Sequence, residues 1–260
     1  MDVVIITSPP DYHFEMAKSS LEAGKHVVVE KPFVPTAKEA AELAEISKKT
    51  GKKLAVYQNR RWDADFLTLK KILAEGTLGD ITEFETHFDR HRPDPPPGAS
   101  WKNVDAEGHG ALYDLGTHLL DQVYHLFGKP RKVTGFVGRQ RRGVTDGAPD
   151  SFTAILHYDG PTIVTAKAGV VSPEEEQLRY WVKGTKGSFK KASPEGSPRA
   201  YQVSSDILHS SISMSKKTSS GSMASVQATK TSALTLQLTT ELSSRFRKRR
   251  PRRKFLDSRP

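Results

Sequence analysis

The sequence contains no cysteine among its 260 residues. Disulfide bonds and thiol chemistry are therefore excluded, and the composition is compatible with a reducing compartment. No stretch approaches the roughly 18 apolar residues of a membrane-spanning helix, and the chain does not open with the charged and then apolar pattern of a signal peptide. We therefore expect a cytoplasmic protein without a membrane partner.

Acidic residues and regular patterning are scarce in the last quarter of the chain. Residues 1–189 carry 25 Lys+Arg and 26 Asp+Glu, whereas residues 190–260 carry 15 and 4. Of the 41 residues 204–244, 19 are Ser or Thr, and 8 of the 10 residues 245–254 are basic. Such a composition cannot bury enough apolar surface to offset the entropy of ordering. We therefore predict that residues 191–260 are a low-complexity basic tail, disordered or translated from a shifted reading frame.

The basic tail permits a second interpretation, since runs of Lys and Arg serve as nuclear localisation signals or neutralise nucleic-acid phosphates. The cluster has no aromatic neighbours beyond Phe246 and Phe255, and no nucleic-acid-binding module is recognisable in the rest of the chain. We regard nucleic acid as the less favoured partner. Deleting residues 191–260 and measuring retention on DNA would separate the two interpretations.

Strands and helices alternate in the first part of the sequence. Strands are expected at residues 2–7, 26–30 and 54–58, and helices at residues 12–23, 36–50 and 63–75. Thr36 and Glu39 fit a capping box, and Gly51 fits the end of the same helix. Alternating elements imply a parallel sheet with right-handed crossovers. Residues 1–62 are therefore predicted to form an α/β unit.

Longer strands follow. They are expected at residues 81–90, 132–139, 151–158, 161–170 and 179–183, with one helix at residues 110–127. This pattern predicts an open, mainly antiparallel α/β domain over residues 63–190, with one face as the wall of a substrate cleft. The proline-rich residues 91–102 are expected to be a loop.

The first chemical motif is the run His26-Val-Val-Val-Glu30-Lys31-Pro32. Three valines predict a strand covered on both faces, and ligands of open α/β sheets bind at the carboxyl ends of such strands. Lys31 would there donate a hydrogen bond to a substrate hydroxyl or relay its proton. The alternative is a surface lysine beside the carboxylate of Glu30.

The second motif is Asp114-Leu-Gly-Thr-His118 within the expected helix of residues 110–127. A spacing of four places the carboxylate and the imidazole on one helix face, an arrangement that can orient a general base. The alternative is a solvated or capping pair. Histidines elsewhere in the sequence lack metal-ligand spacing, so no metal is predicted.

The proline-rich loop carries further candidates for substrate contacts. These are Arg90, His91, Arg92, Trp101 and Lys102, which could bind a polyhydroxylated compound by hydrogen bonds and ring stacking. An ordinary surface loop packed by Trp101 is an equal alternative.

Together these motifs resemble the glucose–fructose oxidoreductase/inositol dehydrogenase/rhizopine-catabolism (Gfo/Idh/MocA) family. Further similar segments are Thr7-Ser8-Pro9-Pro10 through His13, Tyr57-Gln58-Asn59-Arg60-Arg61-Trp62 and Gly76-Thr-Leu-Gly79-Asp80-Ile81. The resemblance runs from Met1 to about Lys190. It implies part of a Rossmann-like sheet followed by a substrate domain, and an NAD- or NADP-dependent dehydrogenase acting on a CH–OH group of a sugar, polyol or inositol-like compound. A homo-oligomeric parent is also implied.

The resemblance assigns roles position by position. Lys31, Asp114 and His118 would be catalytic: His118 would take the hydroxyl proton, Asp114 would orient His118, and Lys31 would stabilise the developing alkoxide. Glu30 would hold Lys31 in position. The residues near the cofactor would be Thr7, Ser8, Pro9, His13, Glu30, Lys31 and Asn59.

The sequence departs from the family in one important respect, because it contains no G-x-G-x-x-G. That motif places backbone amides and a helix N-terminus against the pyrophosphate. The chain opens within what should be the fourth strand of the unit. We therefore expect an inactive fragment without saturable dinucleotide binding at micromolar concentrations. A non-catalytic sugar- or nucleotide-sensing protein on the same fold is the alternative function.

Overall fold

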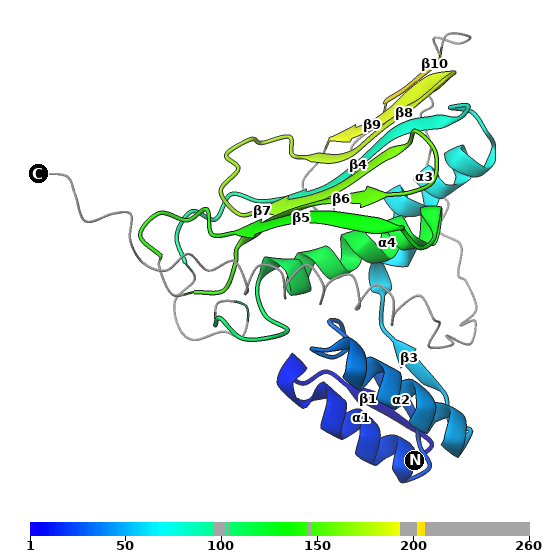
Figure 1. Ribbon diagram of the computed structural model, residues 1–260, viewed down its shortest axis with the longest axis vertical. Coiled ribbons are helices and arrows are strands. Elements are labelled where there is room, and N and C mark those ends of the chain that lie inside the picture. Colours follow the sequence, from blue (N-terminus) through cyan, green and yellow to red (C-terminus); the bar gives the residue numbers. More distant parts are fainter. Residues whose placement is uncertain (96–101, 103, 145–146, 193–201, 206–260) are drawn as a thin grey trace, which may run out of the picture.

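The computed structural model describes residues 1–95, 102, 104–144, 147–192 and 202–205, which form two parts with a separate sheet each (Figure 1). The smaller part contains the N-terminus and the larger part contains most of the strands. The predicted fold class is confirmed: a parallel sheet is followed by a mainly antiparallel sheet with helices. Trp101 and residues 206–260, most of the predicted tail, lie outside the described residues.

The smaller part is a three-stranded parallel sheet of order β1-β2-β3. Its elements in chain order are β1 (Val3–Ile6), α1 (His13–Glu22), β2 (His26–Val29), α2 (Ala37–Thr50) and β3 (Leu54–Val56). Alternate valines of β2 reach the core, where they meet Leu21 of α1 and Leu43 of α2. Burial of this apolar stripe is what fixes the helices on the sheet.

The predicted capping box of α2 is present. The Thr36 hydroxyl oxygen accepts from the Glu39 backbone N–H at 3.2 Å, and the Glu39 carboxylate accepts from the Thr36 N–H at 2.9 Å. Gly51 ends the helix with a φ of 68°, in the left-handed region. Local sequence signals thus set both ends of this helix.

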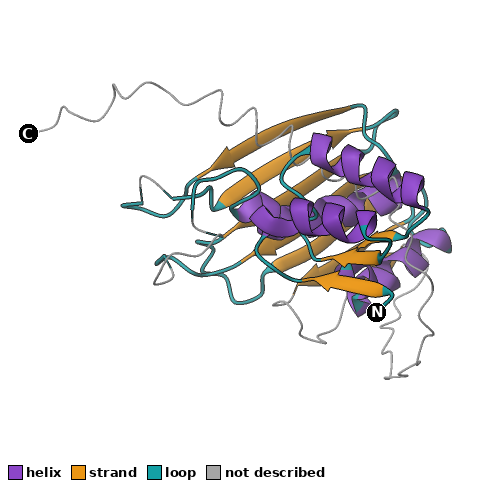
Figure 2. Ribbon diagram, turned by 90° about the horizontal axis from the view of Figure 1, so that it is seen from below, coloured by secondary structure: helices purple, strands orange, loops and turns teal. Residues whose placement is uncertain are grey.

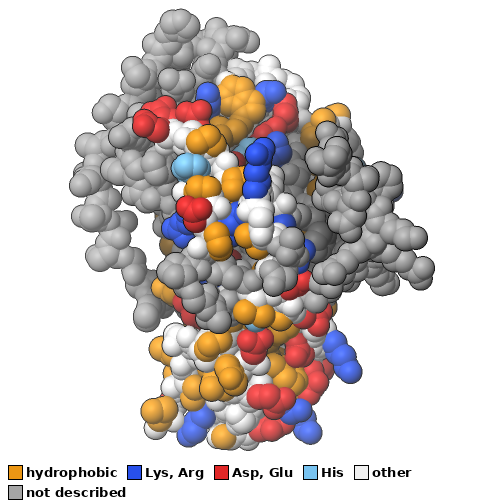
Figure 3. All heavy atoms as spheres, turned by 90° about the vertical axis from the view of Figure 1, so that its left-hand side faces the viewer, with side chains coloured by type: hydrophobic (Ala, Val, Ile, Leu, Met, Phe, Trp, Pro, Cys, Tyr) orange, Lys and Arg blue, Asp and Glu red, His pale blue; other side chains and the backbone are white. Residues whose placement is uncertain are grey.

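The surface of the smaller part carries hydrophobic side chains beside acidic ones (Figure 3). β1 lies at the edge of its sheet, and its Val3 and Ile5 are exposed. An apolar edge strand of this kind is prone to pair with other chains.

The larger part is a seven-stranded sheet of order β10-β9-β8-β4-β7-β6-β5. Its strands are β4 (Ile81–Asp89), β5 (Lys132–Gly138), β6 (Ser151–His157), β7 (Ile163–Gly169), β8 (Leu178–Gly184), β9 (Gly187–Ala192) and β10 (Gln202–Ser205). All neighbours are antiparallel except β4 and β7. β10 pairs with β9, so residues 202–205, which the sequence analysis placed in the tail, extend this sheet.

Two helices and a short connection complete the described structure. The 3₁₀ turn η2 (Asn59–Trp62) and α3 (Ala64–Ala74) lead from β3 into the larger part, and α4 (Thr117–Phe127) lies along its sheet. Viewed from below, helices lie in front of the strands (Figure 2). Leu119, Leu120 and Val123 of α4 are fully buried in a core with Phe84 and Phe152. Within the described ranges, no helix has the length and apolarity to cross a membrane.

The predicted helix of residues 110–127 differs at its start. Leu112–Gly116 form a π-helical turn, and the regular α-helix begins at Thr117. Single π-turns inside helices are frequent at functional sites. The irregular turn contains Asp114 and therefore changes how this carboxylate is presented.

We predict that Leu119→Ala lowers the free energy of unfolding by about 2–5 kcal/mol, because Leu119 is 0% exposed and its removal leaves a cavity. Leu67→Ala is the matched control on α3, where Leu67 is 43% exposed, and we expect a loss of about 1 kcal/mol or less. Urea unfolding followed by circular dichroism measures both. Equal losses would contradict the assignment of α4 to the core.

Candidate active site

Polar residues follow all three strands of the smaller sheet. Thr7 and Ser8 come after β1, Glu30 and Lys31 after β2, and Gln58 and Asn59 after β3. Because the strands are parallel, their carboxyl ends share one edge, which is where open α/β sheets bind ligands. The predicted site residues of the first part therefore lie at one edge.

A buried ion pair joins this edge to the larger part of the molecule. The Lys31 ammonium donates to the Asp114 carboxylate at 2.8 Å and to the Asp114 backbone carbonyl at 2.9 Å. The two side chains are only 17% and 12% exposed. The structure thus brings together two predicted catalytic residues that are 83 positions apart in the sequence.

Asp114 binds a second ammonium group. Lys102 Nζ lies 2.9 Å from one carboxylate oxygen of Asp114 and 3.1 Å from the other. Burial alone would raise the pKa of Asp114, but Lys31 and Lys102 together hold it below its usual range. Asp114 therefore stays a carboxylate, and both of its oxygens face ammonium groups.

Burial is the main influence on Lys31. It lowers the pKa of Lys31 below the ordinary value, and Lys102 acts in the same direction, although Asp114 opposes both. Glu30 accepts the Lys31 backbone N–H at 2.9 Å, and the ammonium itself goes to Asp114. Glu30 therefore contacts the backbone of Lys31 and not its ammonium group, and its role in holding Lys31 stays a prediction.

His118 is 5% exposed and lies edge-on to Phe88, with ring centroids 6.3 Å apart. Its Nδ1 is buried without a hydrogen-bond partner in the described structure. Burial, followed by the charges of Lys31 and Arg60, lowers the pKa of His118 well below 6.5. The imidazole is therefore neutral near pH 7 and able to accept a proton.

No hydrogen bond joins Asp114 to His118 in the described residues, although their spacing predicts that they share one helix face. The Asp114 oxygens are bound to Lys31 and Lys102 instead. A shared helix face requires a regular α-helix from Asp114 to His118. Asp114 instead lies in the π-turn, and His118 follows it in α4. The structure therefore makes Asp114 a partner of lysines, and its influence on His118 is through space alone.

Two glycines allow the turn to pack where it does. Gly110 has a φ of 88°, and a side-chain carbon there would lie 2.7 Å from the Pro149 carbonyl oxygen. At Gly116 an added carbon would lie 3.0 Å from the Phe152 ring. The Gly110 carbonyl accepts from the Asp114 N–H at 2.9 Å. These close approaches set the position of Asp114 against the sheet.

The remaining predicted cofactor residues fall into two groups. Thr7, Pro9 and Asn59 are exposed at the edge of the sheet, where they are open to a ligand. His13 is 1% exposed, and its ring nitrogens lie 2.8 Å from the Ser8 carbonyl and 2.9 Å from the Pro32 carbonyl. Its ring thus connects the loops after β1 and β2. This contact fixes the backbone at Ser8 and at Pro32, the residue that follows Lys31.

Sequence reasoning missed several residues that build the site. Gln58 is 7% exposed, and its buried side-chain oxygen has no partner in the described structure. Arg61 donates to Asp121 of α4 at 2.7 and 2.6 Å, and Gln122 donates to the Arg60 carbonyl at 2.8 Å. Gln58 lies two residues after the end of the buried strand β3, and this position in the sequence could have marked it as a site residue. No pattern in the sequence indicates that η2 pairs with α4.

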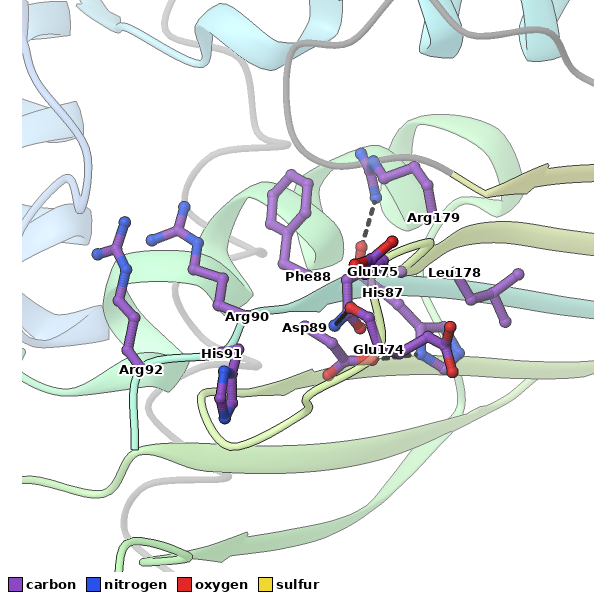
Figure 4. A pocket seen from close by; sticks show the side chains of 11 residues that line it. His87, Phe88, Asp89, Arg90, His91, Arg92, Glu174, Glu175, Leu178 and Arg179 are labelled. Carbon is purple, nitrogen blue, oxygen red and sulfur yellow. Dashed lines mark hydrogen bonds and ion pairs between the residues drawn. The ribbon is translucent and has the colours of Figure 1, made fainter. Parts of the chain in front are cut away.

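A cavity of about 660 Å³ lies against Asp114, a size that suits a small ligand. Its charged lining residues are Arg90, Arg92, Asp94, Lys102, Asp114, Arg141 and Asp150. Arg90, Arg92 and Lys102 were predicted to contact a substrate, and the structure places all three here. Residues 90–92 continue β4 and are called the β4 extension. A smaller pocket beside it shares Arg90 and Arg92 with this cavity and is also lined by residues such as His87 and Glu174 (Figure 4).

Comparison with protein-family models gives two matches. Residues 1–58 match the model described as the oxidoreductase family with an NAD-binding Rossmann fold. Residues 66–190 match the model described as the GFO/IDH/MocA C-terminal domain. The two matches are consecutive and follow the two sheets of the structure.

Individual proteins give a consistent picture. The chain is 46% identical to "Uncharacterized oxidoreductase C115.03" of Schizosaccharomyces pombe, over 74% of this chain and 53% of that protein. It is 39% identical to the scyllo-inositol 2-dehydrogenase (NADP(+)) IolW of Bacillus subtilis, over 78% of this chain and 55% of IolW. The solved structure of YPO2259 from Yersinia pestis has a TM-score of 0.70 and 40% identity, and covers 80% of this chain and 63% of that one. The chain spans about half the length of the curated relatives it matches.

We predict that Asp114→Asn lowers the pKa of Lys31 further, because the carboxylate opposes the effect of burial. The pH dependence of reductive methylation of Lys31, read by mass spectrometry, measures this change. Asp159→Asn is the control, since Asp159 pairs with the exposed Arg131. An unchanged or raised pKa of Lys31 in the Asp114→Asn variant would contradict the geometry.

We predict that His118→Gln flattens the loss of stability on acidification. The pKa of folded His118 lies below 6.5, so below about pH 6.5 the unfolded chain binds a proton that the folded chain does not. This costs up to about 1.4 kcal/mol of unfolding free energy per pH unit until the folded pKa is reached. Urea unfolding between about pH 7 and pH 5 measures the slope, with the exposed His157→Gln as control. A variant that keeps the full wild-type slope would show that His118 is not buried as a neutral group.

Proposed function

Since the chain belongs to the Gfo/Idh/MocA family of oxidoreductases, we propose that its site transfers a hydride between a CH–OH group of a sugar, polyol or inositol-like substrate and NAD or NADP. The contact between Lys31 and Asp114 beside the neutral His118 carries this proposal. An ammonium and an uncharged base, both partly shielded from water, are the groups that oxidation of an alcohol requires.

The residues at the carboxyl edge of the smaller sheet fit the nicotinamide end of a dinucleotide better than its phosphates. Thr7, Pro9 and Asn59 are exposed at the ligand edge, and the buried Gln58 oxygen beside them has no hydrogen-bond partner in the described structure. The 260 residues contain no G-x-G-x-x-G to hold a pyrophosphate. We therefore expect weak binding of the whole dinucleotide, without saturation at micromolar concentrations.

His118 and Lys31 divide the proton chemistry. His118 would accept the proton of the substrate hydroxyl on the imidazole, which is neutral before the reaction. The Lys31 ammonium would donate a hydrogen bond to the same oxygen as negative charge develops there. A bound oxidised nicotinamide would accept the hydride from the substrate carbon that bears this hydroxyl.

Asp114 is a positioning residue in this proposal. Its carboxylate fixes the Lys31 ammonium at 2.8 Å and compensates its charge in a buried place. Orientation of His118, the role that the sequence suggested, would fall to packing against Phe88. IolW, a scyllo-inositol dehydrogenase that uses NADP(+), supports inositols and related polyols as the first compounds to try.

We predict that His118→Gln lowers the rate of hydride transfer by about 10²–10⁴ with little change in dinucleotide affinity, because only the base is lost. Absorbance of the reduced nicotinamide, at millimolar NAD or NADP with a panel of inositols, polyols and sugars, measures the rate. His157→Gln, on the outer end of β6, is the control and should retain wild-type turnover.

Two outcomes would contradict the proposed function. Turnover that survives His118→Gln would remove this residue from the mechanism. Binding of a sugar or dinucleotide without any turnover in the wild-type chain would contradict hydride transfer by this chain and would favour the inactive fragment or the sensing protein, both of which the sequence also suggests.

A further inference from the structure

Three arginine side chains line the cavity that touches Asp114. Arg90, Arg92 and Arg141 line it together with Lys102. Nothing in the proposed hydride transfer uses these guanidinium groups, since the reaction needs only Lys31 and His118 at the hydroxyl. Hydrogen bonds to neutral hydroxyls, which the sequence predicts for Arg90 and Arg92, do not require several guanidinium groups in one lining.

The extension of β4 sets the direction of two of these arginines. The Arg90 N–H donates to the Gly169 carbonyl at 2.9 Å, and the Arg92 N–H donates to the Val170 carbonyl at 2.6 Å. Extended backbone alternates its side chains, so Arg90 and Arg92 point to the same side as Phe88 and His91 points to the other (Figure 4). Arg141 joins them by donating from Nε to the Arg92 carbonyl at 2.9 Å.

Two of the three carboxylates in the same lining, Asp114 and Asp150, are engaged by groups of the chain itself. Asp114 binds the ammonium groups of Lys31 and Lys102. Asp150 accepts the backbone N–H groups of Gln140 and Arg141 at 2.7 and 3.2 Å, and its carboxylate also lies 3.9 Å from the Arg141 guanidinium. Burial, then the nearby charge of Arg92, lowers the pKa of Arg90, and the effect of Asp114 does not outweigh them. The lining holds four cationic side chains and three carboxylates, so positive charge predominates in it.

We propose that Arg90 and Arg92, with Arg141, bind an anionic group of the substrate, so that the site takes a hydroxylated compound that carries a carboxylate or a phosphate. Guanidinium groups match both anions because their planar forks donate paired hydrogen bonds. This inference rests on the proposed function, since it assigns the substrate class to the same site. The reacting hydroxyl would lie toward Lys31, and the anion toward the end of the β4 extension.

Ligand pairs of matched shape test the inference by binding alone. D-gluconate is compared with D-glucitol, and D-glucose 6-phosphate with D-glucose, by calorimetry or ligand-observed NMR on the full chain without dinucleotide. At low ionic strength we expect at least one anionic member to bind about tenfold more tightly than its neutral partner. Added salt should reduce this preference.

Three variants link the preference to the arginines. Arg90→Gln combined with Arg92→Gln should bring the affinity for the anionic member to within about threefold of that for the neutral one. Arg92→Gln alone, at an exposed position, should weaken the preference and keeps the test open if the double variant does not fold. Arg131→Gln is the control, because Arg131 is 71% exposed and pairs with Asp159 elsewhere.

The outcomes distinguish a carboxylate from a phosphate as the anion, and they distinguish failure of the anion site from failure of the proposed hydride transfer. A preference for gluconate supports a sugar acid, and a preference for the phosphate ester supports a phosphorylated substrate. Equal affinities within both pairs, or a preference that survives Arg92→Gln and the double variant, would overturn the inference. Turnover of neutral polyols without anion preference would leave the proposed function standing, whereas an arginine-dependent preference without turnover would leave only the anion site.

Discussion

The Lys31–Asp114 ion pair is the interaction on which the arrangement of the site depends. It connects the carboxyl end of β2 to the π-turn before α4, and so it joins two sheets that share no strand. A buried ion pair is costly to form and weak as a source of stability, but removal of one partner leaves an uncompensated buried charge. The pair is therefore better understood as a device that specifies where the two parts meet.

Other contacts cooperate with this pair. Arg61 and Asp121 form a two-pronged ion pair in which Asp121 is 1% exposed. Gln122 binds the Arg60 carbonyl and accepts from Arg179, which stacks on Phe88 at 4.1 Å. These contacts anchor the η2 connection on α4, the helix that carries His118. The position and charge of His118, the base of the proposed function, are thus determined by the same buried layer that joins the two parts.

Local patterns in the sequence predicted the elements well, because their signals depend on neighbours along the chain. The capping box at Thr36 and the valines of β2 are examples. The meeting of Lys31 with Asp114 came from motifs recognised together, since no local rule joins residues so far apart. The binding of Lys102 to Asp114, the pairing of Arg61 with Asp121 and the parallel pairing of β4 with β7 depend on tertiary packing. The π-turn likewise depends on how Gly110 and Gly116 approach the sheet, which regular helical spacing cannot express.

A double-mutant cycle tests the central claim most directly. Lys31→Met, Asp114→Asn and the double variant are compared with the wild-type chain by urea unfolding. Our account predicts a coupling free energy of about 1–3 kcal/mol, because each single variant leaves the other group buried without its main partner. Effects that add within about 0.3–0.5 kcal/mol would show that the two side chains act independently and would contradict the account.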